Sequence, residues 1–593
     1  MTSRLNFMRE ASARGHWLFG PLRQNSKIYG QTIIAAIIVN LLGLVSSFFI
    51  MTVYDRVLPN QAMESLVVLT VGVLIAYIFD FTLKSLRGYF IDIAGQRLDA
   101  TVGSRVFDNL ISMRLDSRAG STGAIAGLVK EFENLRDFFS SATLVAIVDL
   151  PFIFLFIGVI ALLGGPIALV PLIGVFGALV VGLIVQPVIM RRTRDAMAEG
   201  HLKNSVLIET LAGLETVKTV AAADMMRRRW RDGVLKQAKI STVGRFFNQF
   251  AVNAAAFAQQ FSQAGVVVIG VILVSANQIT MGGLIAAVIL TGRAMAPLGQ
   301  VASLLSRVSG AFESYRSLDR LMTAQSEVEP DREYLARPKL KGKIEFREVS
   351  FTYPGETKRA LDEVSFTIEP GERVAVLGKN GSGKSTIIRQ ITGIYQPTEG
   401  SVLVDDTDIR QIRPTDLRSN IGAVLQDVCL FSGSIKENIT LGLEGISDEA
   451  VLRAAKIAGV HDFVGSSSAG YDQRLAERGE GLSGGQRQSI ALARALAPQP
   501  AMLLLDEPSS SLDSHAEAMM IARLARVTRG RTLMVVTHRL SMVRLVDRVI
   551  VLDQGRVIVD GARDEVMRAM TASARQASQK QLSGPKVVAT EAA

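Results

Sequence analysis

The sequence predicts a six-span α-helical membrane domain fused to an α/β domain built around a P-loop. Three observations support this fold class. The apolar residues are concentrated before residue 305, in stretches long enough to cross a bilayer. Residues 378–385 read G-x-x-x-x-G-K-S between a strand-like apolar run and a helical pattern. From Ile344 onward, short β-rich runs alternate with helical patterns.

Composition separates a membrane half from a soluble half. The 593 residues are 48% hydrophobic and 6% aromatic, and the mean hydropathy of +0.29 is too high for an ordinary soluble protein. The net charge is +10, but Lys and Arg lie between apolar spans, where they set membrane orientation rather than bind nucleic acid. The single cysteine, Cys429, excludes an intrachain disulfide framework. We expect a membrane-embedded protein with no nucleic-acid partner.

Six apolar stretches give the predicted topology. They lie at 33–53, 66–83, 142–163, 167–190, 251–275 and 282–302. The connection after the first is a turn at 54–60, and those after the first, third and fifth spans are short and carry little positive charge. The other connections are long or basic, so the positive-inside rule puts both termini in the cytoplasm. Helical patterning through 84–141 and 191–250 predicts helices that continue beyond the bilayer.

The domain boundaries follow from these changes in composition and periodicity. We predict a cytoplasmic lead-in at 1–29, a six-helix transmembrane domain at 30–324, a polar linker at 325–343, a nucleotide-binding domain at 344–575 and a disordered tail at 576–593. Two charged residues, Asp149 and Arg293, fall in or near the spans, where a charge usually faces a cavity or a partner. For Asp149 the alternative is a place in ordinary water at the cytoplasmic mouth.

The loop at 378–385 has the chemistry of a phosphate site. Its glycines let the backbone approach a polyphosphate, and its N–H groups with the following helix N-terminus supply a positive field. We expect Lys384 to reach the β- and γ-phosphates and the Ser385 hydroxyl to ligate Mg²⁺. The candidate nucleotide-binding residues here are Gly378, Lys379, Asn380, Gly381, Ser382, Gly383, Lys384, Ser385 and Thr386.

A second apolar run, at 502–505, ends in two acids. Asp506 at the strand end can hold Mg²⁺, a role that phosphoryl-transfer sites give to a carboxylate. Glu507 can polarise the attacking water as a general base. A further apolar run at 535–536 leads to His538. A lone histidine after a strand is more often structural, so a catalytic role for His538 depends on the family resemblance given below.

The segment Leu-Ser-Gly-Gly-Gln at 482–486 matches the signature of ATP-binding-cassette (ABC) ATPases, and it lies between the phosphate loop and Asp506 as in that family. Gln426 resembles the family's glutamine loop, and Ser511-Leu512-Asp513 its D-loop. The resemblance implies ATP and Mg²⁺ as cofactors and head-to-tail pairing of two cassettes. It implies catalytic roles for Glu507 and His538, Mg²⁺ ligands in Ser385, Gln426 and Asp506, and nucleotide contacts from Tyr353, Gln426, Ser483, Gly484, Gly485, Gln486 and Asp513.

Six spans followed by one cassette resemble an ABC exporter half-transporter. Short helices near 115–125 and 221–231 are then the expected coupling elements, and Glu477-Arg478-Gly479 resembles the exporter loop that senses them. A soluble ABC ATPase is excluded by the six spans. An importer cassette is normally a separate chain, so the fusion favours export.

Three further segments resemble type I secretion permease/ATPases, which export RTX proteins: residues 17–22, 51–59 and 149–152. The resemblance implies ATP-driven export of an unfolded polypeptide across the bacterial inner membrane by a homodimer, with a periplasmic membrane-fusion adaptor and an outer-membrane channel as partners. Many relatives carry an N-terminal C39 peptidase domain. About 29 residues and no cysteine precede the first span here, so we do not expect a bacteriocin-processing exporter. The sequence represents either an exporter group without that domain or a chain from which the domain has been removed. The alternative is a lipid or multidrug exporter, whose cavity should be more apolar and aromatic than a polypeptide conduit.

Overall fold

The protein consists of two compact units. A computed structural model describes residues 16–117, 122–140, 147–329, 332–443, 445–465 and 468–582. One unit comprises residues 1–113 and 119–325, and the other comprises 326–593 together with the short segment 114–118. Each unit has its own buried apolar clusters, so each has the core that an independent domain requires.

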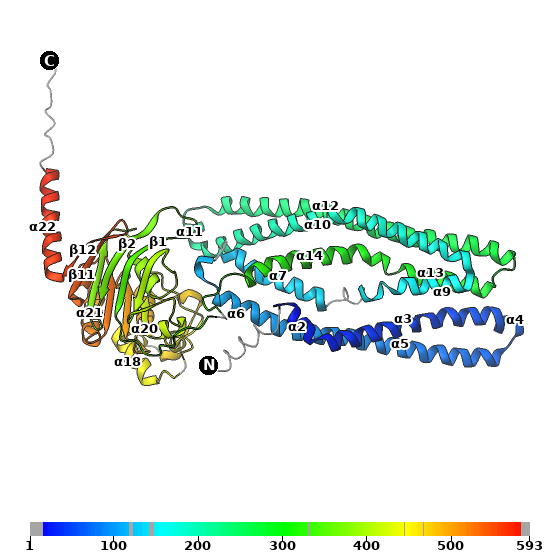
Figure 1. The fold of residues 1–593 in the computed structure, drawn as a ribbon, viewed down its shortest axis with the longest axis horizontal. Coiled ribbons are helices and arrows are strands. Elements are labelled where there is room, and N and C mark those ends of the chain that lie inside the picture. Colours follow the sequence, from blue (N-terminus) through cyan, green and yellow to red (C-terminus); the bar gives the residue numbers. More distant parts are fainter. Residues whose placement is uncertain are drawn as a thin grey trace, which may run out of the picture. The chain divides into compact units, whose positions relative to one another are not determined.

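The first unit is a set of long helices that lie side by side (Figure 1). Two π-helical segments, Val53–Val57 and Asp99–Gly103, extend α3 and α5 without a break. The described helices are α2 Phe19–Gln24, α3 Ser26–Thr52, α4 Leu58–Asn60, α5 Met63–Leu98, α6 Ser104–Ser112, α7 Thr122–Ser140, α9 Phe152–Gly164, α10 Leu169–Ala212, α11 Leu214–Thr219, α12 Ala223–Ser275, α13 Met281–Met295 and α14 Leu298–Met322.

Five helical segments in the described part of the chain are long and apolar enough to cross a membrane: Ser26–Asn60, Met63–Ser112, Ile147–Ala212, Ala223–Ser275 and Met281–Gln300. The third contains two of the predicted spans, because the chain reverses between α9 and α10 at Gly165–Ala168 (Figure 1). Gly165 takes a φ of +53°, which favours glycine. The six predicted spans thus correspond to α3, α5, α9, α10, α12 and α13; the start of the third, up to residue 146, lies outside the described residues.

Two local predictions were wrong. The turn expected at 54–60 is helical, because a π-helix absorbs the extra residue and the chain turns only at Gln61, with φ +52°. The short helix expected near 221–231 is wrong, because residues 220–222 form a turn and α12 starts at Ala223; the short helix α11 precedes that turn. Near 115–125 the described residues form a 3₁₀ turn, Leu115–Ser117, and the start of α7 at Thr122; residues 118–121 lie outside the described part.

Asp55 ties the end of α3 to the start of α13. Its carboxylate accepts a hydrogen bond from the Thr280 hydroxyl at 2.6 Å and one from the Gly282 backbone N–H at 2.8 Å. The Thr280 hydroxyl also caps α13 by accepting from the N–H of Gly283. A Cβ atom at Gly282 would fall 2.7 Å from the Asp55 carboxylate, so glycine permits this approach. The Asp55 bonds therefore fix the register of the two helices.

Asp149 pairs with two neighbouring helices. Arg87 on α5 donates to its two carboxylate oxygens at 3.0 and 3.3 Å, and Asn40 on α3 donates to it at 3.1 Å. The Arg87 residue is 8% exposed. A charged group in a span costs roughly 2.5–3.5 kcal/mol on insertion scales, so pairing with Arg87, which lies beyond the end of the second span, offsets the cost of Asp149 within the third. The expectation that Asp149 faces a partner is met inside the chain.

The N-terminal segment at 17–22 packs onto α14. The Trp17 indole N–H donates to the Asp319 carboxylate at 2.9 Å, and its ring stacks on Tyr315 with centroids 5.6 Å apart. Leu18 is 2% exposed within the same cluster. The segment at 17–22 therefore packs against the last helix of this unit.

The second unit holds the α/β domain. Its six-stranded sheet has the order β12-β11-β3-β10-β9-β6, and a four-stranded sheet has the order β2-β1-β4-β5. The strands are β1 Ile344–Thr352, β2 Arg359–Ile368, β3 Arg373–Gly378, β4 Glu399–Val404, β5 Thr407–Asp408, β6 Ile421–Val424, β7 Gly433–Ser434, β8 Arg474–Leu475, β9 Met502–Asp506, β10 Thr532–Val536, β11 Arg548–Asp553 and β12 Arg556–Ala562. Strands β11, β3, β10, β9 and β6 are parallel. Their carboxyl ends therefore meet at one edge, where ligands bind in such sheets.

Helices flank these sheets (Figure 1). They are α15 Lys384–Ile391, α16 Pro414–Ser419, α17 Ile435–Thr440, α18 Asp448–Ala458, α19 Val460–Val464, α20 Gly484–Leu496, α21 Ser514–Val527 and α22 Arg563–Leu582. The last helix continues to Leu582, past the boundary at 575 that we predicted. The rest of the expected tail lies outside the described residues.

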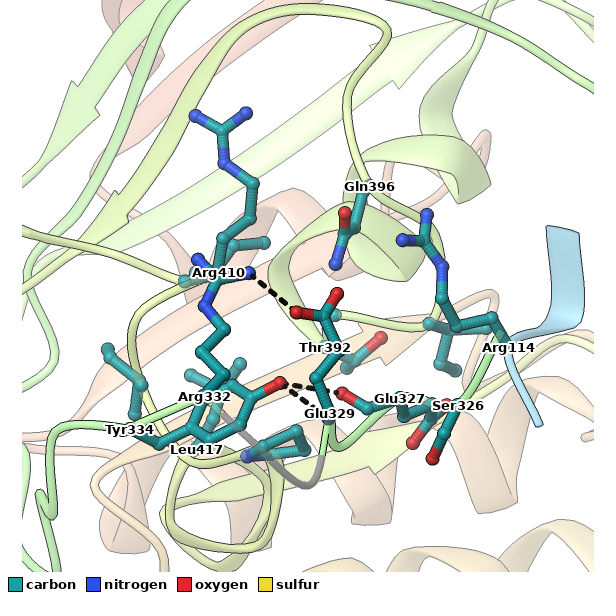
Figure 2. A pocket seen from close by; sticks show the side chains of 15 residues that line it. Arg114, Ser326, Glu327, Glu329, Arg332, Tyr334, Thr392, Gln396, Arg410 and Leu417 are labelled. Carbon is teal, nitrogen blue, oxygen red and sulfur yellow. Dashed lines mark hydrogen bonds and ion pairs between the residues drawn. The ribbon is translucent and has the colours of Figure 1, made fainter. Parts of the chain in front are cut away.

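The predicted linker at 325–343 is bound to this unit over much of its length. Arg418 donates to the two carboxylate oxygens of Glu327 at 2.7 and 3.0 Å. The Tyr334 hydroxyl bonds to the backbone at Glu327 and Glu329 (Figure 2). The cavity beside these residues has a volume of about 30 Å³, too small for a nucleotide. The linker is therefore anchored rather than free.

Candidate active site

The phosphate loop joins β3 to α15 at the carboxyl edge of the sheet. Lys384 opens the helix, is 7% exposed and donates to the carbonyls of Gly378 and Lys379, both at 2.8 Å. Burial lowers the pKa of its ammonium, although the nearby acids Glu507 and Asp506 oppose that shift. Gly383 has a φ of +99°, and a Cβ atom there would collide with the Ala360 carbonyl. The loop therefore presents a buried ammonium held by neutral carbonyls.

Asp506 at the end of β9 is the strongest candidate for a Mg²⁺ ligand. It is 3% exposed, and its Oδ1 atom has no hydrogen-bond partner among the residues that the structure describes. Burial raises the pKa of its carboxyl, and a hydrogen bond with Ser385 opposes this rise. An orphaned carboxylate oxygen beside a hydroxyl matches the oxygen ligands that Mg²⁺ prefers. The residues present therefore fit the ion.

Glu507 adopts a left-handed conformation, with φ +47°. Such a backbone costs roughly 1–3 kcal/mol for a residue other than glycine and often marks a functional site. Its carboxylate lies 2.7 Å from Nδ1 of His538 and accepts a bond from the Thr537 hydroxyl at 3.3 Å. The Glu507 side chain is 10% exposed and that of His538 59% exposed. The two predicted catalytic residues are thus in direct contact.

Tyr353 lies just beyond β1, beside α15. Its hydroxyl is 3.0 Å from the Thr386 hydroxyl and accepts a bond from Arg389 at 2.9 Å. Its ring packs edge-on against Phe351 and Tyr395, with centroids 4.9 and 5.3 Å away. This packing holds the ring at the entrance to the phosphate loop.

One cavity of about 520 Å³ unites most of the predicted residues. Its lining consists of Tyr353, Glu356, Lys358, Arg359, Ala360, Asn380, Gly381, Gly383, Lys384, Ser385, Thr386, Gln426, Asp506 and Glu507. Of these, Glu356, Lys358 and Arg359 were missed by sequence reasoning, although two basic residues one strand away from a phosphate loop were a usable signal. The cavity combines an aromatic ring, a cationic loop and two acids, which suits a nucleoside triphosphate with its metal.

The signature and D-loop residues do not line this cavity in the part of the chain described. Ser483 caps α20 by accepting from the Gln486 N–H, and Gln486 returns a bond to the Ser483 N–H. Asp513 caps α21 by accepting from the Ala516 N–H at 2.7 Å. Gly484 and Gly485 lie against Ser511 and Leu512. The signature therefore forms a separate surface beside the D-loop.

Gln488 connects that surface to the cavity, and sequence reasoning missed it. Its amide donates to the Glu507 carbonyl at 2.7 Å, and its oxygen accepts from the Ser511 N–H at 3.1 Å. Gln488 is 4% exposed, and a glutamine buried to this extent normally has hydrogen-bond partners, as it does here. Its place two residues after the signature was the only sequence signal.

Comparisons with known proteins agree with this site and fold. Residues 361–510 match the family described as ABC transporter, and residues 30–298 match the ABC transporter transmembrane region. The chain is therefore a membrane transporter that couples ATP hydrolysis to transport.

Curated relatives place it more closely. It is 33% identical over 554 residues to the cyclolysin secretion/processing ATP-binding protein CyaB of Bordetella pertussis, covering 93% of this chain and 78% of the relative. It is 32% identical over 563 residues to the toxin RTX-I translocation ATP-binding protein of Actinobacillus pleuropneumoniae, with the same coverage. A bacterial Atm1-family ABC exporter with ATP bound shares the fold, with a TM-score of 0.79 at 24% identity over 94% of this chain and 99% of that one. The chain belongs to the ABC transporter family, among the exporters similar to RTX toxin secretion ATP-binding proteins.

Proposed function

We propose that this protein exports an unfolded polypeptide across the bacterial inner membrane, as a homodimer with both cassettes in the cytoplasm. The observation that carries the proposal is the similarity, over 93% of the chain, to proteins described as secreting or translocating toxins. A periplasmic membrane-fusion adaptor and an outer-membrane channel complete the path. The cargo is a secreted protein.

A cavity of about 370 Å³ in the helical unit is formed by α7, α10 and α12. Its lining is mostly polar, with apolar side chains from Ile189, Ala196 and Met197. Nearly all of these residues lie in the helical extensions that are predicted to continue beyond the bilayer, where polar side chains are expected for any cargo. The choice of a polypeptide cargo therefore depends on the similarity to the toxin exporters.

The cassette residues have distinct roles in ATP hydrolysis. Lys384 binds the β- and γ-phosphates, and Tyr353 stacks on the adenine. Ser385, Gln426 and Asp506 would hold Mg²⁺, which would neutralise phosphate charge. Glu507 takes the proton of the attacking water, and His538, hydrogen-bonded to it, contacts the γ-phosphate.

A second copy of the chain completes each site. Ser483, Gly484, Gly485 and Gln486 form a surface outside the chain's own cavity, available to a partner's ATP. Mixed dimers test this arrangement, with Lys384→Ala in one chain and Ser483→Arg in the other. One composite site then carries both lesions and the other neither, so the mixture should retain more ATPase activity than either mutant alone. Activity no higher than that of either mutant would contradict composite sites.

The cargo is tested with purified protein in nanodiscs. A C-terminal fragment of a secreted protein encoded beside this one should change the ATPase rate, because cargo recognition must bias closure of the dimer. The same fragment with its sequence scrambled is the control. Strong stimulation by lipid A or drugs, with no response to the polypeptide, would instead assign the protein to the lipid or multidrug exporters.

A further inference from the structure

Three charged residues fall within the six apolar spans of this chain: Asp80, Asp149 and Arg293. Asp80 pairs with Lys84 at 2.7 Å, and Asp149 pairs with Arg87. Arg293, on α13, has no acidic partner among the residues that the structure describes. Its Nη2 atom donates a hydrogen bond of 3.1 Å to the Ser46 hydroxyl. A hydroxyl accepts the bond but does not neutralise a guanidinium, which stays protonated in proteins.

Arg293 lies at mid-membrane depth. It follows the first residue of α13 by twelve positions, which is roughly 18 Å of helix in a hydrocarbon core about 30 Å thick. The Asp55 bonds to Thr280 and Gly282 hold α3 level with α13, which brings Ser46 to the same depth. The segment Met281–Gln300 is also the most interior of the candidate spans: its apolar window is 56% buried, compared with 11–33% for the others.

The neighbouring helix leaves room for the guanidinium. A Cβ atom at Gly43 would fall 2.7 Å from Nη1 of Arg293, so only glycine accommodates the present position. Ser46, one turn on, is 7% exposed and also donates to the Gly43 carbonyl at 3.3 Å. The Gly43–Ser46 turn of α3 thus cradles Arg293, while most of its five N–H donors remain available. Arg293 itself is partly exposed.

We infer that Arg293, with Ser46 and Gly43, is an anion site that binds carboxylates of the cargo as they pass through the membrane. A guanidinium binds a carboxylate through paired hydrogen bonds, and carboxylates are the ordinary anions of a polypeptide. Lipid phosphates lie about 15 Å from the bilayer centre, at the hydrocarbon boundary, too far to reach this depth. The inference rests on the proposed polypeptide export.

Two peptides test the site. One is an unstructured Gly/Ser-rich peptide with aspartates, and the other has asparagines at the same positions. Binding is measured by fluorescence anisotropy to the nucleotide-free protein in phosphatidylcholine nanodiscs at physiological ionic strength, where long-range attraction is screened over ~8 Å. We expect the wild type to prefer the aspartate peptide by about tenfold. Arg293→Gln should abolish most of that preference, and Arg293→Lys should keep part of it.

Matched variants separate the site from net charge. Arg56→Gln removes the same charge from an exposed position at the end of α3 and should leave the preference unchanged. Gly43→Ala keeps the arginine but displaces the guanidinium, so it should also reduce the preference. It provides the test if Arg293→Gln does not fold. Persistence of the preference in both Arg293→Gln and Gly43→Ala would overturn the inference.

The outcomes also distinguish the inference from the proposed function. Equal binding of both peptides to the wild type overturns the anion site and leaves polypeptide export standing. Binding of neither peptide also overturns the anion site and leaves polypeptide export to the test with the cargo fragment. In a separate arm, phosphatidylglycerol is added to the nanodiscs and tightly bound lipid is counted by mass spectrometry. Loss of bound phosphatidylglycerol in Arg293→Gln, without peptide discrimination in the wild type, would identify a lipid phosphate as the ligand and overturn the cargo assignment.

Discussion

The cassette and the helical unit each offer a charge that neighbouring groups satisfy and a charge that they do not. In the cassette, Glu517 accepts bonds from Ser509 and Ser541, whereas Asp506 keeps an oxygen without a hydrogen-bond partner among the residues that the structure describes. In the helical unit, Arg87 pairs with Asp149, whereas Arg293 bonds a hydroxyl. The unsatisfied charges have opposite signs: the cassette has an acid that fits a cation, and the helical unit has a cation that fits an anion. The comparison indicates that charges satisfied within the chain stabilise the fold. Charges that are not satisfied there bind ions or ligands of the opposite sign from outside the chain.

The largest expected effect comes from the strained acid of the site. Glu507→Gln should lower the ATPase rate by ~10²–10⁴-fold, the usual loss when a general base is removed, while ATP binding persists. Phosphate release and nucleotide binding, measured on the same purified protein, check this. Glu449→Gln, an exposed acid at the start of α18, is the matched control. Near wild-type turnover in Glu507→Gln would remove this residue from the proposed role.

Lys384 is a buried ammonium whose described hydrogen-bond partners are two uncharged carbonyls. By the same comparison, we expect it to bind a ligand. Lys384→Ala should weaken ATP binding by roughly 10–100-fold, the value of one or two charged hydrogen bonds. Equilibrium binding of a fluorescent ATP analogue measures this. Lys379→Ala removes the side chain of a neighbouring loop lysine and should change the affinity less. Equal losses in the two variants would mean that the positive charge of the loop, rather than the place of Lys384, determines binding.

The paired arginine should behave differently. Arg87→Gln leaves the Asp149 carboxylate with Asn40 alone, and we expect a loss of about 1–3 kcal/mol of stability, as for a buried group that loses its partner. Asp149→Asn should cost a similar amount, and the double variant should lose less than the sum of the two. Thermal unfolding in detergent gives these values. Additive losses would show that the pair is not coupled.

The smallest effect separates two of the buried acids of the cassette, Glu517 and Asp506. Burial pushes the pKa of Glu517 up, but hydrogen bonds from Ser541 and Ser509 and the charge of Arg539 outweigh it and lower the pKa. A lowered pKa stabilises the fold above the ordinary value of 4.5, and this contribution is lost as the pH falls through the folded-state pKa. Glu517→Gln should therefore lower the apparent Tm by about 2–4 °C at neutral pH, and by less as the pH falls below about 4.5.

Asp506→Asn is the counterpart, measured without nucleotide. Burial disfavours its ionised carboxylate, so the amide should leave the apparent Tm at neutral pH unchanged or raise it by a few degrees, while ATPase activity is lost. A clear fall in Tm would mean that the ionised Asp506 carboxylate stabilises the fold, which would contradict the comparison.

The sequence predicted which cassette residues lie together, because several of them occur at strand ends. The phosphate loop, Asp506 and Glu507 follow buried strands, and parallel pairing brings those ends together. Gln426 and Tyr353 needed the family resemblance, because neither has a local pattern of its own. Gln488 and the bond between Glu507 and His538 depend on how loops pack, which no periodicity encodes.

In the helical unit, the six spans were predictable from apolar length, and their partnerships were not. Arg87 is 62 positions from Asp149, and Asp55 is 225 from Thr280, so neither contact leaves a local signal. The π-helix at Val53–Val57 was missed because its residues resemble a turn by composition. A helix that absorbs an extra residue differs from a turn in hydrogen bonding, which the residue types alone do not determine.

The Asp55 carboxylate also has a mechanical consequence. It bonds both the hydroxyl that caps α13 and the Gly282 N–H, so it links the ends of α3 and α13. When the helices of this unit rearrange during transport, we expect α3 and α13 to move together. Arg293 and Ser46 would then stay in contact throughout the movement.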